Sequence, residues 1–225
     1  MQHKNALSLS KKMQLIIGIL TLSTFLSSCG GAKTDQAATT TVDATGLKKF
    51  EQKKDGFDLN GNSTKIADFT LYYPENFVEM VAPEGLESMF AEPDETKGVY
   101  KDGISVFSEP YVKTSAIKLD KTVCDEYAAQ YKTAYATAFQ VTPEQFTLVS
   151  AEAVTKKNPN IGGADTEVCY LAYSFPGSGT TINANFGLYR YSSSGTPLKV
   201  VAALYEDASP NIDALKRSVR LFEQK

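Results

Sequence analysis

The chain has 225 residues, with 23 Lys and Arg against 26 Asp and Glu, and its formal net charge is −3. Proteins that bind nucleic acid present basic surfaces, so this balance argues against a nucleic-acid partner. The composition includes no tryptophan and one histidine, His3.

The first 28 residues have the three parts of an export signal. Lys11 and Lys12 precede an apolar run from Met13 to Leu26, and small residues follow that run. Polar side chains interrupt the run, and it is shorter than the roughly 20 apolar residues that a membrane-spanning helix needs. We therefore predict that residues 1–28 form a signal peptide, not a permanent span.

The segment Leu26-Ser27-Ser28-Cys29 resembles the bacterial lipobox, in which a cysteine receives a diacylglycerol and becomes the mature N-terminus. The resemblance implies that Cys29 is lipidated. Two acyl chains give stable anchoring, because each buried methylene contributes about 0.8 kcal/mol. We expect the remaining chain to lie outside the cytoplasm, held by lipid at the cell membrane or outer membrane according to the host. The alternative is an ordinary secretory signal with an incidental cysteine.

Removal of the leader changes the inventory of reactive side chains. It takes away His3, Lys4, Lys11 and Lys12 but no acid, and leaves 20 basic and 26 acidic residues. Without histidine, a Ser-His-Asp or Cys-His nucleophile and a histidine-containing metal site are excluded. We expect no enzyme, no cofactor and no metal. The alternative is an enzyme of unrecognised type that uses carboxylates such as Asp102, Asp120 or Glu167 for acid/base chemistry.

The residues after the leader divide into a tether and one predicted domain. Residues 29–47 are the lipidated cysteine and a small, polar, flexible segment that cannot form a core. Residues 48–225 form a single domain whose core begins near residue 66.

The first predicted elements of this domain are two strands, at residues 69–73 and 103–107. Between them lies a segment that we predict to be an exposed loop, with acidic residues Glu84, Glu87, Glu92, Asp94 and Glu95. These oxygens could bind Ca²⁺, but the spacing does not fit an EF-hand, so we favour a solvated acidic surface.

Later in the chain, apolar residues three and four apart predict a helix over residues 122–139, with Asp120 as its N-cap. Four strands and a helix should follow, at residues 146–154, 166–175, 181–191, 198–205 and 211–221. Turn residues between the last three strands predict an antiparallel meander. The order of elements predicts an α+β fold: about six mainly antiparallel strands packed by two helices.

Two cysteines remain after lipidation, Cys124 on the predicted helix and Cys169 on a predicted strand. In an oxidising compartment they can pair, which stabilises the fold by roughly 3 to 4 kcal/mol. Alternatively, they are two small buried side chains.

Two further motifs have simpler explanations than a functional site. Gly177-Ser178-Gly179 follows Pro176, where a nucleophile elbow requires glycine, so we predict a turn. Asn62-Ser63-Thr64 matches a glycosylation acceptor, which usually has no meaning in a bacterial host.

The layout of residues 66–225 resembles the PsbP-like family. The resemblance rests on Phe69 to Phe77, the strand Ile104-Ser105-Val106, the long helix, Tyr170 to Tyr173 and Ser218 to Phe222. It implies an antiparallel sheet between helices, in proteins that mostly act as accessory or docking modules at a membrane.

The tyrosines could supply a recognition surface, although most should be core; they are Tyr127, Tyr131, Tyr135, Tyr170, Tyr173, Tyr189 and Tyr191. We therefore expect a lipid-anchored binding or assembly module of the bacterial envelope. Its partners would be the membrane and another envelope protein or small ligand. A purely structural envelope lipoprotein is the remaining alternative.

Overall fold

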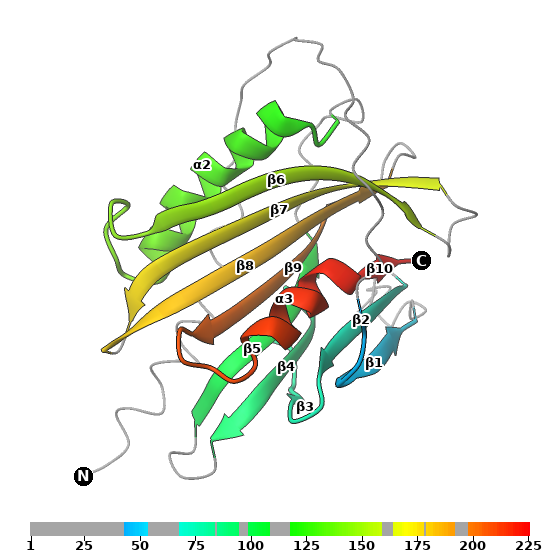
Figure 1. Ribbon diagram of the computed structural model, residues 1–225, viewed down its shortest axis with the longest axis horizontal. Helices are drawn as coiled ribbons and strands as arrows, with labels where there is room; N and C mark the ends of the chain where they lie inside the picture. The colour runs from blue at the N-terminus through cyan, green and yellow to red at the C-terminus, as the bar shows by residue number, and fades with distance from the viewer. Residues whose placement is uncertain are drawn as a thin grey trace, which may run out of the picture.

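The computed structural model describes residues 43–53, 68–83, 85–94, 99–108, 118–158, 164–177, 179–191 and 198–225. Cys29, most of the predicted tether and Asn62-Ser63-Thr64 lie outside these residues. The described residues form an α+β fold of two helices and ten strands in two sheets (Figure 1).

The larger sheet has seven antiparallel strands in the order β3-β4-β5-β9-β8-β7-β6. Their bounds are β3 Val78–Glu79, β4 Leu86–Asp94, β5 Val99–Ser108, β6 Thr147–Asn158, β7 Ala164–Gly177, β8 Thr180–Tyr191 and β9 Lys199–Glu206. The strands β7, β8 and β9 are neighbours in this order, so the predicted meander is confirmed. The β7–β8 hairpin turns within two residues, and Gly179 adopts φ +86°, a conformation that favours glycine.

A second sheet has three strands, in the order β1-β2-β10. Its members are β1 Leu47–Gln52, β2 Phe69–Pro74 and β10 Glu223–Gln224. The central strand β2 pairs antiparallel with both neighbours, and Phe69 lies between Gln52 and Gln224. This sheet therefore joins the first and last strands of the described chain.

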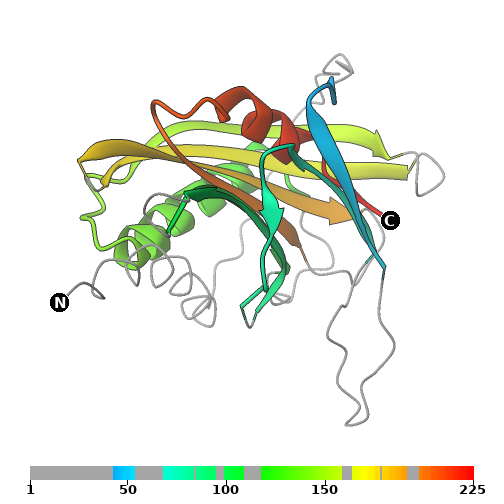
Figure 2. The same cartoon turned by 90° about the horizontal axis from the view of Figure 1, so that it is seen from below.

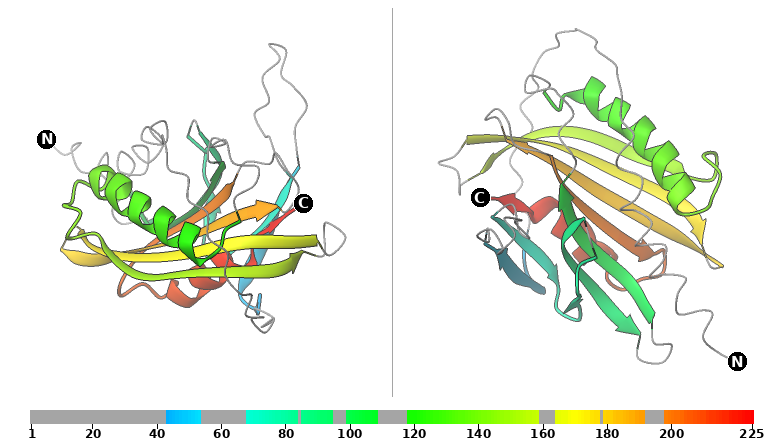
Figure 3. Two further views of the ribbon diagram at one scale, coloured as in Figure 1. Left: turned by 90° about the horizontal axis from the view of Figure 1, so that it is seen from above. Right: turned by 180° about the vertical axis from the view of Figure 1, so that it is seen from behind.

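The helix α2, Lys121–Ala138, packs over β6 and β7 on one face of the larger sheet (Figure 3). Asp120 is its N-cap, as predicted: the side-chain Oδ1 accepts a hydrogen bond from Val123 N at 3.1 Å. Tyr131 and Tyr135 project from the helix onto Phe186 of β8, with ring centroids 5.4 and 4.7 Å away. These contacts form the first of two apolar cores.

The helix α3, Ile212–Leu221, lies on the opposite face of the sheet from α2, together with the three-stranded sheet (Figure 2). Leu215, Val219 and Phe222 are buried in this second core. Gly187 of β8 permits the close approach, because a Cβ there would lie 3.1 Å from Val219 Cγ1 and 2.7 Å from Tyr189 Cε2. One helix therefore covers part of each face of the larger sheet.

Cys124 of α2 and Cys169 of β7 form a disulfide, with their Cα atoms 5.6 Å apart. Both residues have no exposed surface. The bond joins α2 to the sheet that it covers, in the interior of the first core.

The strand prediction was incomplete and wrong in one place. The structure adds β1, β3, β4 and β10 to the six predicted strands. The segment that we predicted to be an acidic loop contains β4, whose Phe90 and Ala91 have no exposed surface. The charged side chains of β4 made the segment look like an exposed loop in the sequence. Two of them, Glu87 and Glu92, instead have hydrogen-bond partners inside the protein.

The disulfide closes a loop of 45 residues in sequence separation. We expect the double substitution Cys124→Ala and Cys169→Ala to lower the free energy of unfolding by about 3 to 4 kcal/mol, because the unfolded chain gains conformational freedom. Urea denaturation with and without reductant measures this. Reductant should destabilise the parent protein and leave the double variant unchanged; equal sensitivity of both would contradict the prediction.

Candidate functional site

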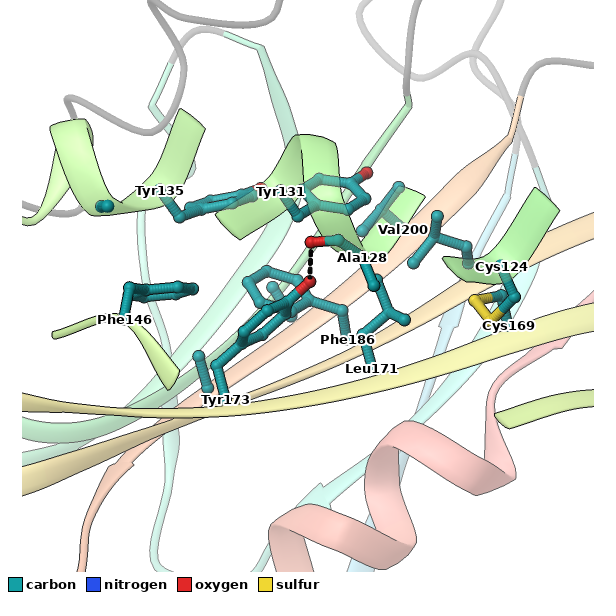
Figure 4. Close-up of a cluster of buried hydrophobic side chains, with 14 of the residues drawn as sticks. Cys124, Ala128, Tyr131, Tyr135, Phe146, Cys169, Leu171, Tyr173, Phe186 and Val200 are labelled. Carbon is teal, nitrogen blue, oxygen red and sulfur yellow. Dashed lines mark hydrogen bonds between the residues drawn. A yellow bond between two sulfur atoms is a disulfide. The ribbon is translucent and has the colours of Figure 1, made fainter. Parts of the chain in front are cut away.

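Tyr131 and Tyr135 of α2 and Tyr173 of β7 belong to the first core, as Figure 4 shows. Tyr131 and Tyr135 are each 4% exposed, and Tyr173 is 1% exposed. The Tyr173 hydroxyl donates a hydrogen bond to Ala128 O at 2.7 Å, which ties β7 to the middle of α2. Burial raises the pKa of Tyr173 above its ordinary value. These side chains are packed inside the protein and present no surface to a partner.

Two further tyrosines belong to the second core. The Tyr189 hydroxyl donates to Val219 O near the end of α3, and the Tyr170 hydroxyl lies 3.4 Å from that of Tyr189. Arg220 covers the ring of Tyr170, with its guanidinium carbon 4.5 Å from the ring centre. Burial raises the pKa of both tyrosines. Of the predicted recognition residues, Tyr127 alone is half-buried, and the side chain of Tyr191 lies outside the described set.

Of the three candidate carboxylates, Asp120 and Glu167 hold the start of α2. Asp120 caps the helix, and Glu167 Oε2 accepts a hydrogen bond from Leu119 N at 2.9 Å. Glu167 also lies 3.8 Å from Arg190 Nη1 across the β7–β8 pair. Both carboxylates thus fix the backbone that leads into α2.

The third candidate, Asp102, organises the turn between β9 and α3. Its Oδ1 accepts from Glu206 N at 3.3 Å, and its Oδ2 accepts from the Ser209 hydroxyl and from Asn211 Nδ2 at 3.0 Å. Asn211, the N-cap residue of α3, also donates to Glu92 Oε2 at 2.8 Å. Asp102 is 2% exposed, so its carboxylate is committed to these donors.

A polar cluster that the sequence analysis missed lies between the two sheets. It consists of Gln52, Glu87, Ser108 and Lys199, and we call it the Lys199 cluster. Lys199 Nζ donates to Glu87 Oε1 and to Ser108 Oγ, and the Ser108 hydroxyl donates to Glu87 Oε1. Gln52 Nε2 donates to Glu87 Oε2 at 3.2 Å. The side chains of Lys199 and Glu87 are only 1% and 6% exposed, so this is a buried ion pair.

The strand register explains how this cluster forms. Ser108 and Lys199 are direct partners at the end of the β5–β9 pair. The β4–β5 pairing shifts between Leu86 and Ser88, and the resulting bulge lets Glu87 reach the pair. Side chains alternate between the two faces of a strand, so Lys199 lies on the same face of β9 as the buried Val201 and Ala203. This pattern could have shown from the sequence that Lys199 is buried.

The chemistry of the Lys199 cluster is that of a satisfied ion pair. The Lys199 amine forms the ion pair with Glu87, and the Ser108 hydroxyl and the Gln52 amide donate further hydrogen bonds to the same carboxylate. The arrangement therefore links β1 of the three-stranded sheet to β4, β5 and β9 of the larger sheet.

Of the acidic residues that could bind Ca²⁺, the two with described side chains, Glu87 and Glu92, have separate partners. Glu87 binds Lys199, Glu92 binds Asn211, and Glu84 and Glu95 lie outside the described residues. Within the described ranges, no group of three or more His, Cys, Asp or Glu side chains is placed to hold a metal ion. The turn at Gly177 and Gly179 joins two strands and lacks the helix that a nucleophile elbow requires.

The described part of the chain contains two helices, α2 and α3. Neither α2 nor α3 combines the length and the apolar character that a span requires.

Comparison with known proteins finds no matching family model and no matching curated protein. Sixteen chains of solved structures match, among them these two. One is a protein from Bacteroides thetaiotaomicron, with 16% identity and a TM-score of 0.32; the match covers 70% of this chain and 45% of that protein. The other is LpqN of Mycobacterium tuberculosis, described as involved in cell envelope biogenesis, with 11% identity, a TM-score of 0.41 and coverage of 82% and 94%. These similarities assign no family to the chain.

The buried hydroxyl of Tyr173 gives a test of this packing. Tyr173→Phe should lower the free energy of unfolding by about 1 kcal/mol at neutral pH, because one hydrogen bond is lost. Above pH 10 the unfolded chain releases the Tyr173 proton while the folded protein keeps it, so stability falls as pH rises. Denaturation at several pH values should give a shallower fall for Tyr173→Phe. Tyr127→Phe, at a half-buried position, is the control and should retain the parental slope.

The Lys199 cluster gives a second test. Lys199→Met should cost about 3 to 5 kcal/mol of unfolding free energy, because the Glu87 carboxylate stays buried without a cation. Combining it with Glu87→Gln should recover part of the loss, since no buried charge then remains.

Urea denaturation of the two single variants and the double variant measures the coupling. Lys157→Met breaks an exposed pair with Asp165 and should cost about 1 kcal/mol or less. If Lys199→Met costs no more than this control, the cluster is not a buried ion pair.

Proposed function

We propose that the protein is a lipid-anchored, extracytoplasmic module of the bacterial envelope that binds or assembles another envelope component and catalyses no reaction. We further propose that its two-sheet architecture is a PsbP-like sandwich. The observation that carries the proposal is the segment Leu26-Ser27-Ser28-Cys29 directly after an apolar run.

Placement outside the cytoplasm is supported by the disulfide between Cys124 and Cys169. Disulfides persist in oxidising compartments and are rare where thiols are kept reduced. This support is independent of the leader, because it depends on two residues in the first core.

Binding in preference to catalysis is supported by the roles of the polar side chains. Asp102, Asp120 and Glu167 each accept hydrogen bonds from backbone N–H groups, and Asp102 does so beside Ser209 and Asn211. The enzyme alternative needs a pair of these carboxylates to face a substrate. Asp102 of β5 binds the turn between β9 and α3, whereas Asp120 and Glu167 hold the start of α2. The helices α2 and α3 lie on opposite faces of the sheet (Figure 2).

The anchor is tested by Cys29→Ala in the full chain. The parent protein should sediment with membranes and incorporate a radiolabelled fatty acid. The variant should lose the label completely and accumulate as precursor or as released protein, because no thiol receives the diacylglycerol.

Cys124→Ala is the matched control, because it removes a cysteine at a site that the lipidation machinery does not use. Its fatty-acid label should equal that of the parent. Cross-linking in intact cells, followed by mass spectrometry, should then give discrete partner adducts with the parent and fewer with Cys29→Ala. An unchanged label in Cys29→Ala would overturn the proposal.

A further inference from the structure

The strand β6 forms one margin of the seven-stranded sheet (Figure 1). It pairs with β7 along one side, and no strand among the described residues pairs with its other side. From Ser150 to Asn158 the pairing with β7 is regular, so this stretch, which we call the β6 edge, presents an uninterrupted backbone. β6 has 12 residues, whereas strands are usually about 5 to 6 residues long. A long open edge is a template for pairing with another strand.

The opposite margin of the sheet offers much less backbone. It is formed by β3, which has two residues. A second copy that placed its β3 against β6 would form few backbone hydrogen bonds, whereas two β6 edges match each other in length. The lengths therefore favour β6 against β6.

An antiparallel pair of identical strands is related by a two-fold axis perpendicular to the sheet. Such an axis keeps each face of the sheet on its own side, and residues directly opposite one another share a face. The axis must therefore pass through a position at which one residue lies opposite its own copy.

The charged residues of the β6 edge limit where this axis can lie. They are Glu152, Lys156 and Lys157. An axis at any of these three places like charges directly opposite each other, which is destabilising. An axis at Val154 places Glu152 opposite Lys156 of the second copy, and symmetry makes this contact twice. No other axis position along the β6 edge places unlike charges opposite each other.

Both charged groups of this contact can take a further partner. Glu152 binds Arg220 through Oε2 at 2.7 Å, and its side chain is 48% exposed. Lys156 Nζ donates to two neutral groups, Phe222 O at 2.8 Å and Arg220 O at 3.2 Å. Burial lowers the pKa of Lys156 to about 8, against the charge of Glu223. The two acids and two bases balance within one copy, so pairing adds no net charge at the junction.

The helix α2 leaves room for the second copy. In its first turn, Cys124 is bonded to the β7 partner of Ala153. At its other end, Phe139 stacks on Phe146, which lies just before β6, with ring centroids 6.2 Å apart. The helix therefore runs over the part of β6 that precedes Val154. The axis places the second α2 over the corresponding part of the other strand, so the two helices occupy different positions along the joined strands.

We propose that a second copy of this chain pairs with the β6 edge, antiparallel and around a two-fold axis at Val154, so that one sheet runs through both copies. Each Glu152 carboxylate then lies between Arg220 of its own copy and Lys156 of the other. Backbone hydrogen bonds join the strands, and the two charge pairs fix the register. Two copies of the proposed envelope module therefore act as one unit, with or without lipid at Cys29.

Cysteine cross-linking of the full chain in intact cells tests the position of the axis. Residues directly opposite in an antiparallel pair have Cα atoms about 4.5 to 5.5 Å apart, within the range of a disulfide. Val154→Cys should therefore give a dimer that reductant removes. Ser150→Cys is the matched control on the same edge, because its two copies would lie about 27 Å apart. Val154→Cys should give about tenfold more dimer than this control or the parent.

Charge reversal in the Val154→Cys background tests the register. Glu152→Lys or Lys156→Glu alone creates two like-charge contacts, so the yield of dimer should fall about tenfold. Combining the two reversals restores unlike pairs and should recover most of the yield. Lys157→Gln is the control, because position 157 lies on the other face of the strand, opposite Ala151 of the second copy. It should leave the yield unchanged.

Sedimentation of the parent full chain, purified in detergent, measures association without any substitution. It should show monomer and dimer in equilibrium. A monomer alone at concentrations up to about 0.1 mM, or equal cross-linking of Val154→Cys and Ser150→Cys, would overturn the proposal. A dimer that neither single reversal weakens would overturn the register at Val154. Cross-linking of Val154→Cys to a protein of another mass, in place of the dimer, would assign the β6 edge to a different partner and also overturn the proposal.

Discussion

The structure depends on one constraint: the central strands of the seven-stranded sheet, β9 above all, are buried on both faces. Along β9, Val200 and Ala202 belong to the core under α2, whereas Val201 and Ala203 belong to the core under α3. A polar side chain buried in such a sheet lowers the stability of the fold by several kcal/mol unless it has a hydrogen-bond partner. Lys199 and Asp102, which lie in the interior on β9 and β5, both meet this requirement through fixed hydrogen bonds.

The elements whose periodicity is strong could be predicted from the sequence. The helix α2 begins at Lys121 and ends at Ala138, within one residue of the prediction, because its buried tyrosines recur at helical spacing and Asp120 caps it. The hairpin between β7 and β8 was also predicted, since glycine at position 179 supplies the positive φ of a tight turn. For Cys124 and Cys169 the sequence left two alternatives, a disulfide or two separate buried thiols. The structure places them on facing elements, where they form the disulfide.

Elements that depend on distant partners could not be predicted. Lys199 is 112 residues from Glu87, and without that contact β4 looks like a charged loop. The strand β1 has two exposed lysines and only Leu47 and Phe50 as apolar residues, so its strand character comes from pairing with β2. The two-residue strand β10 has no local signal at all and exists through the same pairing. The Lys199 cluster depends on these contacts, and it was missed for the same reason.

The position of β2 has a consequence for synthesis of the protein. Phe69 of β2 is covered by Phe222, with ring centroids 5.3 Å apart, and the second edge of β2 is occupied by β10. The amino-terminal part of a chain is synthesised first. Phe69 and that edge of β2 therefore stay uncovered until residues about 150 positions later have been made. A nascent polypeptide that stalls before residue 212 would therefore expose an open strand edge and an aromatic surface, the combination from which association between unfinished chains begins.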